Sequence, residues 1–153
     1  MNRVVVTGMG AVTPIGNDVE SFWQGLVSGK CGIGPVTKFD TAEFKVKVAA
    51  EVKDFDPSRY MEKAELRKYD VFCQYALAAA AQAVETSRIQ GSLPSEEIGV
   101  YFGSGIGGIG TFEEQQKLML EKGPRRVSPF FIPALIINMA GGLIAIKYDF
   151  QGA

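Results

Sequence analysis

Two short apolar runs, each passing directly into a glycine-rich turn, constrain the fold of this chain more than any other feature. Residues 3–7 are RVVVT and lead into GMGAVTPIGN, and residues 98–102 are IGVYF and lead into GSGIGG. Apolar runs of this length, rich in β-branched or aromatic residues, are typical of buried strands in a parallel sheet. Because helical patterns separate the two runs, the sequence predicts an α/β fold with a mainly parallel sheet.

The segment after the first glycine-rich turn has the signals of a short helix. Asn17 is placed as an N-cap, with Glu20 three residues later in the manner of a capping box. Apolar residues recur at helical spacing from Val19 to Val27, and Gly29 is predicted to end the helix. Farther along, residues 46–52 (VKVAAEV) are predicted to form another strand.

Three further helices are predicted. The first runs from Glu62 to Ser87 and has an alanine-rich second half, YALAAAAQAV. A helix with many small side chains and few polar groups is typically buried, so we expect this helix at the centre of the fold. Residues 111–123 have an amphipathic pattern, and a last helix is predicted over residues 134–148, with Pro133 in its first turn.

Composition excludes several classes of function. The net charge of −1 gives no overall field that would attract nucleic acid or a membrane surface, so neither is expected as a partner. The longest uncharged run, residues 130–146, is shorter than a membrane-spanning helix and contains Pro133, so it is predicted to be a buried helix. The chain has no histidine and two cysteines. We therefore expect no metal site, and a reducing cytoplasm is the natural location.

Neither cysteine has the surroundings of a nucleophile. Cys73 falls on the apolar part of the long helix, where we expect it to act as a small buried hydrophobe. Cys31 follows Lys30 in the loop GKCGIGP and is expected to be partly exposed, but no neighbouring base activates it. The sequence therefore predicts no catalytic residue within this chain.

The glycine-rich turns invite comparison with nucleotide-binding loops. In the first, Gly8 and Gly10 match a dinucleotide fingerprint, but Thr13 stands at the third glycine position and the helix begins only near Asp18. The second lacks the Lys and Ser/Thr of a Walker loop. Tight turns and close backbone packing account better for both loops. For GSGIGG a functional interpretation stays open, in which the glycines line a wall beside a substrate and Ile106 projects into it.

Five segments, RVVVTGMGAVTPIGN, GKCGIGPVTKFD, RKYDVFCQYALAAAAQAV, GVYFGSGIGG and KGPRRVSPFFIPALIINMAGG, follow one another along the chain. Taken together they resemble the β-ketoacyl-[acyl carrier protein] synthase family, and within it the elongating enzymes of type II fatty-acid synthesis. The resemblance implies an α/β, thiolase-like layered αβαβα fold, of which residues 1–153 form the N-terminal half only. It also implies a homodimer and no cofactor.

The resemblance further implies an acyltransferase of fatty-acid elongation. In this family a cysteine at a helix N-terminus takes the acyl chain from acyl carrier protein, and malonyl-carrier protein then loses CO2 and attacks the acyl-cysteine. The partner is therefore acyl carrier protein that carries acyl or malonyl phosphopantetheine. The family pattern places the cysteine shortly after Ala153 and the histidines and lysine later, so we expect residues 1–153 to be inactive alone. A non-catalytic subunit resembling a chain-length factor and, from another class, a nucleotide-binding module are the alternatives.

Seven residues receive roles from the resemblance. Ile106 matches a residue that lines and gates the acyl channel, and Phe131 matches one that reaches across the dimer toward the partner's channel. The residues implied to bind the acidic carrier protein are Lys63, Arg67, Lys68, Arg125 and Arg126. The family's first lysine aligns with Ala64, one place after Lys63. Clustered basic side chains that face an acidic partner mainly raise the association rate and the specificity. Without the resemblance, the same residues are interpreted as core residues and a solvated face.

Overall fold

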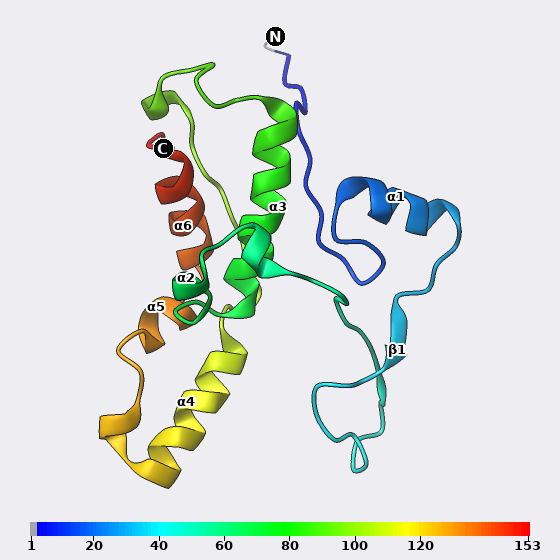
Figure 1. Cartoon of the computed structure of the whole chain (residues 1–153), viewed down its shortest axis with the longest axis vertical. Coiled ribbons are helices and arrows are strands. Elements are labelled where there is room, and N and C mark those ends of the chain that lie inside the picture. Colours follow the sequence, from blue (N-terminus) through cyan, green and yellow to red (C-terminus); the bar gives the residue numbers. More distant parts are fainter. Residues whose placement is uncertain (1–2) are drawn as a thin grey trace.

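The computed structural model describes residues 3–153, which fold mainly into helices joined by extended segments (Figure 1). In chain order the elements are α1 (Val19–Val27), β1 (Ile33–Pro35), β2 (Val48–Ala50), η1 (Pro57–Arg59), α2 (Lys63–Leu66), α3 (Val71–Ser87), η2 (Ser95–Glu97), α4 (Ile109–Lys122), η3 (Pro124–Arg126), α5 (Phe131–Leu135) and α6 (Met139–Tyr148). The elements labelled η are short 3-10 helices.

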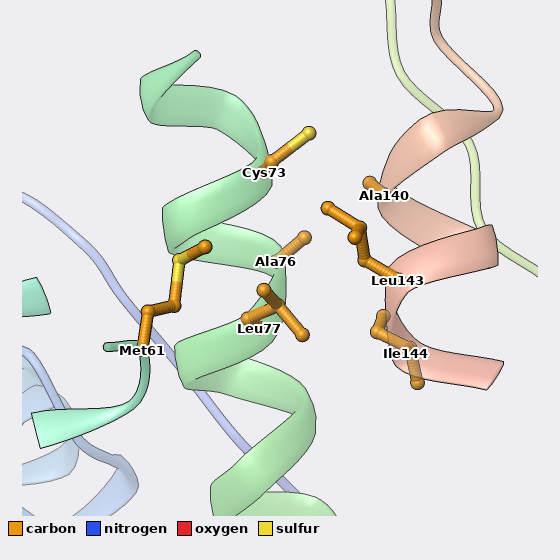
Figure 2. Packing of buried hydrophobic residues seen from close by; sticks show 7 residues of the cluster. All are labelled: Met61, Cys73, Ala76, Leu77, Ala140, Leu143 and Ile144. Carbon is orange, nitrogen blue, oxygen red and sulfur yellow. The ribbon is translucent and has the colours of Figure 1, made fainter. Parts of the chain in front are cut away.

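Helices α3 and α6 lie side by side and form the core between them (Figure 1). The buried cluster consists of Met61, Cys73, Ala76, Leu77, Ala140, Leu143 and Ile144 (Figure 2). Alanine at positions 76 and 140 lets the two helices approach closely, because little more than backbone separates them there. The prediction that the alanine-rich helix is central to the fold is confirmed.

The prediction of one continuous helix from Glu62 to Ser87 is wrong, because the structure interrupts it. It divides into α2 and α3. Asp70 has an extended backbone with ψ 160°, and its side chain accepts a hydrogen bond from the Phe72 N–H. An aspartate in this position competes with helical continuation because it caps a new helix. The interruption creates the turn that contains Arg67, which is exposed, and Lys68, which is half-buried.

The last predicted helix, residues 134–148, also divides, into α5 and α6. Ile136 is extended, with ψ 138°, and separates the two. Pro133 is accommodated within the first turn of α5, as predicted. In the uncharged run 130–146, Ala134, Ala140 and Leu143 are buried, whereas several isoleucines are exposed, so the prediction of a buried helix holds only in part. None of the helices in residues 3–153 has the length and apolar character needed to cross a membrane.

The runs at residues 3–7 and 98–102 were predicted to be buried strands, and both predictions are wrong. Val4 is 92 % exposed and Tyr101 is 89 % exposed. Within the described residues, the second run forms only an isolated parallel bridge between Gly99 and Gly152. Apolar character correctly indicates an extended segment, but a strand also needs a neighbouring strand that exchanges backbone hydrogen bonds with it.

The sheet in the described part of the chain is an antiparallel hairpin of β1 and β2, with Ile33 opposite Ala50 and Pro35 opposite Val48. The prediction of a strand within 46–52 is confirmed for its three central residues. Its partner was not predicted, because glycine and proline in GIGP are depleted in strands. The predicted mainly parallel sheet is therefore not formed by residues 3–153. Figure 1 shows α1 and this hairpin on one side of the α3–α6 core.

Gly8 and Gly10 let the amino-terminal segment lie directly on α3. A Cβ atom at Gly10 would come within 1.8 Å of the Ala79 carbonyl oxygen, and one at Gly8 within 2.3 Å of a carbonyl oxygen one turn farther along. The Gln82 amide adds hydrogen bonds to Ala11: Oε1 accepts from the Ala11 N–H at 3.1 Å, and Nε2 donates to the Ala11 carbonyl at 3.2 Å. The interpretation of this glycine turn as close backbone packing is confirmed.

Helix α1 begins where predicted but has a different cap. Asp18, rather than Asn17, is the N-cap: its Oδ1 accepts from the Ser21 N–H at 2.7 Å, and Ser21 Oγ accepts from the Asp18 N–H at 3.3 Å. Asn17 Nδ2 instead donates to the Lys53 carbonyl at 2.8 Å. Gly29 follows the C-cap with φ +68°, which confirms the predicted end of the helix.

Candidate functional site

The turn between α2 and α3 packs against the beginnings of α4 and α5, and a pocket of about 190 Å³ lies between them. Arg67 and Lys68 line the pocket from the turn, Thr111 from the first turn of α4, and Phe131 from the start of α5. Two of the predicted basic residues and one predicted channel residue thus surround a single pocket, although they are far apart in the sequence.

Asp70 joins the two sides of this pocket. Its Oδ1 accepts a hydrogen bond from the Phe72 N–H at 3.3 Å and so caps α3. Its Oδ2 accepts from both the N–H of Thr111, at 3.0 Å, and the Thr111 hydroxyl, at 2.6 Å. The N-cap of α4 is Gly108, which has no side chain to bond the free N–H groups of that helix. One carboxylate therefore serves the N-termini of two helices, where the helix dipoles favour negative charge.

Aromatic side chains extend the pocket toward α5. Lys68 Nζ lies 5.5 Å from the centre of the Phe130 ring, within the range of a cation–π interaction. The adjacent Phe131 ring contacts Phe112 of α4, with centroids 6.2 Å apart and an interplanar angle of 32°. A positive charge and an aromatic pair consequently lie next to each other at this surface.

Ile106 is 66 % exposed in the second glycine-rich loop. The following two glycines hold this loop against α5. A Cβ atom at Gly107, where φ is +80°, would come within 2.5 Å of the Leu135 carbonyl oxygen, and Gly108 donates its N–H to that same oxygen at 2.9 Å. Any larger residue at either position would push the loop away from α5. The loop that presents Ile106 is thus fixed to the end of the helix that begins with Phe131.

The structure places the other predicted basic residues elsewhere. Lys63 lines a separate open groove of about 930 Å³ together with Arg59 and Lys147. Arg125 and Arg126 are exposed in η3, at the opposite end of α4 from Thr111. These arginines lie beyond the far end of α4, which runs from Ile109 to Lys122, but Ser128, two residues after Arg126, also lines the pocket. Two of the five basic residues therefore line the pocket, Arg125 and Arg126 lie just before its Ser128 edge, and Lys63 lies in another groove.

Neither cysteine is placed for catalysis. Cys73 is fully buried, and desolvation by burial, with a smaller effect of the Asp70 charge, raises the pKa of its thiol to about 12. Cys31 is exposed, as predicted, and its Sγ donates a weak hydrogen bond to the Ile33 carbonyl at 3.8 Å. Over residues 3–153, no group of three or more His, Cys, Asp or Glu side chains could hold a metal ion.

Sequence analysis missed Asp70 and Thr111. An aspartate directly before the apolar pattern VFCQYAL is an N-cap signal, and this signal could have revealed the start of α3. The bond to Thr111 has no local signal, because 41 positions separate the two residues.

Comparison with known proteins identifies the relatives of this chain. The family model described as "Beta-ketoacyl synthase, N-terminal domain" matches residues 1–153. The chain is 47 % identical over 151 residues to 3-oxoacyl-[acyl-carrier-protein] synthase 2 of Synechocystis, 48 % identical to that of Coxiella burnetii and 46 % identical to that of Staphylococcus aureus. Each match covers 98 % of this chain and 36 % of the relative, so the chain spans about a third of their length.

Solved structures agree with this result. One match is a chain of a complex described as a type II polyketide acyl carrier protein with its ketosynthase bound to the hexaketide. Its TM-score is 0.79 and its identity 25 %, over 97 % of this chain and 40 % of that one. The ishigamide ketosynthase/chain length factor matches with a TM-score of 0.79 and 28 % identity, over 97 % and 38 %. A beta-ketoacyl synthase from Burkholderia phymatum, 23 % identical with a TM-score of 0.80, has the same fold over all of this chain and 38 % of its own. The predicted thiolase-like fold is confirmed.

Proposed function

The chain belongs to the β-ketoacyl synthase family, and we propose on this basis that it is the amino-terminal part of an acyltransferase that elongates acyl chains on acyl carrier protein. The observation that supports the proposal best is the 46–48 % identity to 3-oxoacyl-[acyl-carrier-protein] synthase 2 along 151 residues. The match begins near the first residue and leaves out only a few positions of the chain.

The proposed reaction is a decarboxylative Claisen condensation in two stages. A cysteine thiolate first attacks the acyl thioester on the carrier protein, and the carrier's thiol leaves. Malonyl-carrier protein then loses CO2, and the resulting carbanion attacks the acyl-cysteine. This step releases the thiolate and leaves a 3-oxoacyl chain, longer by two carbons, on the carrier. We assign the thiolate to the part of the protein that these residues do not include, since Cys73 is inaccessible and these residues contain no histidine that could act as a base for Cys31.

We propose that the pocket between the α2–α3 turn and α5 marks the side on which the carrier protein docks. Arg67 and Lys68 would attract its acidic surface and raise the association rate. Arg125 and Arg126 would form a second contact at the far end of α4, and Lys63 a third in its own groove. The proposal draws support from the ketosynthase relative that was solved in complex with its acyl carrier protein.

Beyond the docking side, we propose that Ile106 gates the acyl channel and that Phe131 contributes to the channel of the second subunit in a homodimer. Both lie on the structural unit formed by the glycine loop and α5. A cytoplasmic location completes the proposal.

The test is a condensation assay with the full-length protein. Purified protein is incubated with an acyl-carrier protein and malonyl-carrier protein, and the carrier-bound products are analysed by mass spectrometry. We expect a 3-oxoacyl-carrier product and the release of one CO2 per condensation. Failure to form this product from acyl chains of short, medium and long length would contradict the proposal.

A second candidate is a non-catalytic subunit, because one of the structural relatives is a ketosynthase/chain length factor pair. Intact mass after incubation with acyl-carrier protein alone distinguishes the two. An added acyl group on the protein indicates the enzyme. An unmodified mass, together with condensation only after a second ketosynthase chain is supplied, indicates the non-catalytic subunit.

A further inference from the structure

We infer that Asp70 is a positioning residue. It keeps the turn that contains Arg67 and Lys68 (the carrier-docking turn) in a fixed position relative to the loop that presents Ile106 (the acyl-gate loop). The inference rests on the proposed function and extends it to a residue with no assigned role. It follows from three sets of contacts: those that fix the turn to α3, those that fix the glycine loop to α4 and α5, and those of the one carboxylate between them.

The first set fixes the turn. Arg67 and Lys68 lie three and two positions before Asp70, respectively. Gln74 of α3 reaches back to the turn, and its Nε2 donates to the carbonyl of Leu66 at 3.4 Å and to that of Tyr69 at 3.2 Å. The backbone on both sides of the two basic residues is thereby tied to α3.

The second set fixes the gate. Gly108 donates its N–H to the Leu135 carbonyl at 2.9 Å, and its own carbonyl accepts from the Phe112 N–H at 3.0 Å. Gly107 donates to Ser104 Oγ at 3.0 Å, which closes the loop around Ile106. The loop, the first turn of α4 and the end of α5 therefore move together.

The carboxylate of Asp70 links these two units. Its two bonds to Thr111 engage the third residue of α4, while its other oxygen caps α3. Because Gly108 offers no side chain, the first turn of α4 depends on Asp70 for a capping acceptor. A carrier protein docked on Arg67 and Lys68 is then held in a fixed position and orientation relative to Ile106.

The test compares two acyl donors in single-turnover acylation of the full-length synthase, followed by intact mass. One donor is an acyl-carrier protein, which uses the docking turn, and the other is the same acyl chain on free pantetheine, which does not. The variant is Asp70→Asn. Asparagine is as good an N-cap as aspartate, so α3 stays capped. Its amide, however, has one acceptor oxygen in place of two, so it cannot cap α3 and also accept from the Thr111 N–H.

We expect Asp70→Asn to slow acylation from the carrier protein about tenfold, the scale of one lost hydrogen bond to a charged group. Acylation from pantetheine should change less than about twofold, because that donor does not bind the carrier-docking turn. The matched control is Asp18→Asn, which makes the same change at the N-cap of α1 and should leave both rates unaltered.

An equal loss with both donors, or no loss with either, overturns the inference, because a merely structural cap does not distinguish the donors. If Asp70→Asn does not fold, Thr111→Val removes the hydroxyl bond alone, and Thr111→Ser, which retains it, should restore the wild-type ratio of the two rates. Wild-type protein that accepts neither donor contradicts the proposed function itself. Wild-type activity with variants that fail to discriminate overturns only the role of Asp70.

Discussion

Burial determines the chemistry of Cys73. Its thiol is enclosed between α3 and α6 (Figure 2), and burial raises its pKa from an ordinary 9.0 to about 12. The unfolded chain therefore releases this proton near pH 9, while the folded protein keeps it. Below pH 9 the contribution of the protonated thiol to stability is fully present, and it is lost as the pH rises toward 12.

We expect the free energy of unfolding of the full-length protein to fall with pH above 9, and Cys73→Ala to reduce the slope of that fall. Denaturant titrations at several pH values between about 8 and 11 measure both slopes. Tyr75 and Tyr148, whose pKa values burial also raises, add to the slope in both proteins. Equal slopes in the variant and the wild type would show that Cys73 is not the group responsible.

At the scale of elements, the packing of the amino-terminal segment on α3 leaves no room for a side chain at position 10. We expect Gly10→Ala to lower the free energy of unfolding by about 1–3 kcal/mol, because its Cβ atom would lie 1.8 Å from the Ala79 carbonyl oxygen and the backbone would have to shift. Thermal or denaturant unfolding of the full-length protein measures the change.

Gly142→Ala is the matched control. Gly142 lies inside α6, and a Cβ atom there meets nothing within 4 Å. The same substitution should raise stability by about 0.5–1 kcal/mol, since alanine loses less backbone entropy than glycine in a helix. Similar losses at positions 10 and 142 would mean that close packing on α3 does not constrain position 10.

The accuracy of sequence-based prediction also varies by element. Signals contained within a few residues succeeded: Gly29 ends α1, Pro133 sits in the first turn of α5, and the alanine-rich helix forms the core. Local signals did not distinguish two neighbouring N-cap residues of α1: Asn17 was predicted, whereas Asp18 is the N-cap. Strands failed at 3–7 and 98–102 because a strand depends on partners elsewhere in the chain.

Similar reasons limited prediction of the site. The resemblance to a family indicated Arg67, Lys68 and Phe131, and the structure places all three around one pocket. Composition and periodicity alone would have assigned them to a solvated face and a core. The bond from Asp70 to Thr111 lies beyond both approaches, because it joins two helix starts that are distant in sequence.

For the whole molecule, the distribution of apolar surface is the dominant feature. Residues 1–153 leave Val4, Tyr101, Leu120 and Ile146 each at least 75 % exposed. Exposed apolar area of this extent is typical of surfaces that another part of a protein covers. The stability of the chain alone is therefore expected to be low.

We expect residues 1–153, expressed as an isolated fragment, to aggregate or to unfold without a cooperative transition. Size-exclusion chromatography with light scattering and differential scanning calorimetry test this directly. A monomer with one sharp and reversible melting transition would contradict the expectation.

The bonds between Gln82 and Ala11 also have a consequence for synthesis on the ribosome. The two residues are 71 positions apart. At roughly 5–20 residues per second, the partner of the amino-terminal segment is made roughly 4–14 s after the segment itself. Throughout that interval the segment from Gly8 to Ala11 has no α3 to lie against. A chaperone that binds extended apolar segments thus has several seconds in which to capture each newly made chain.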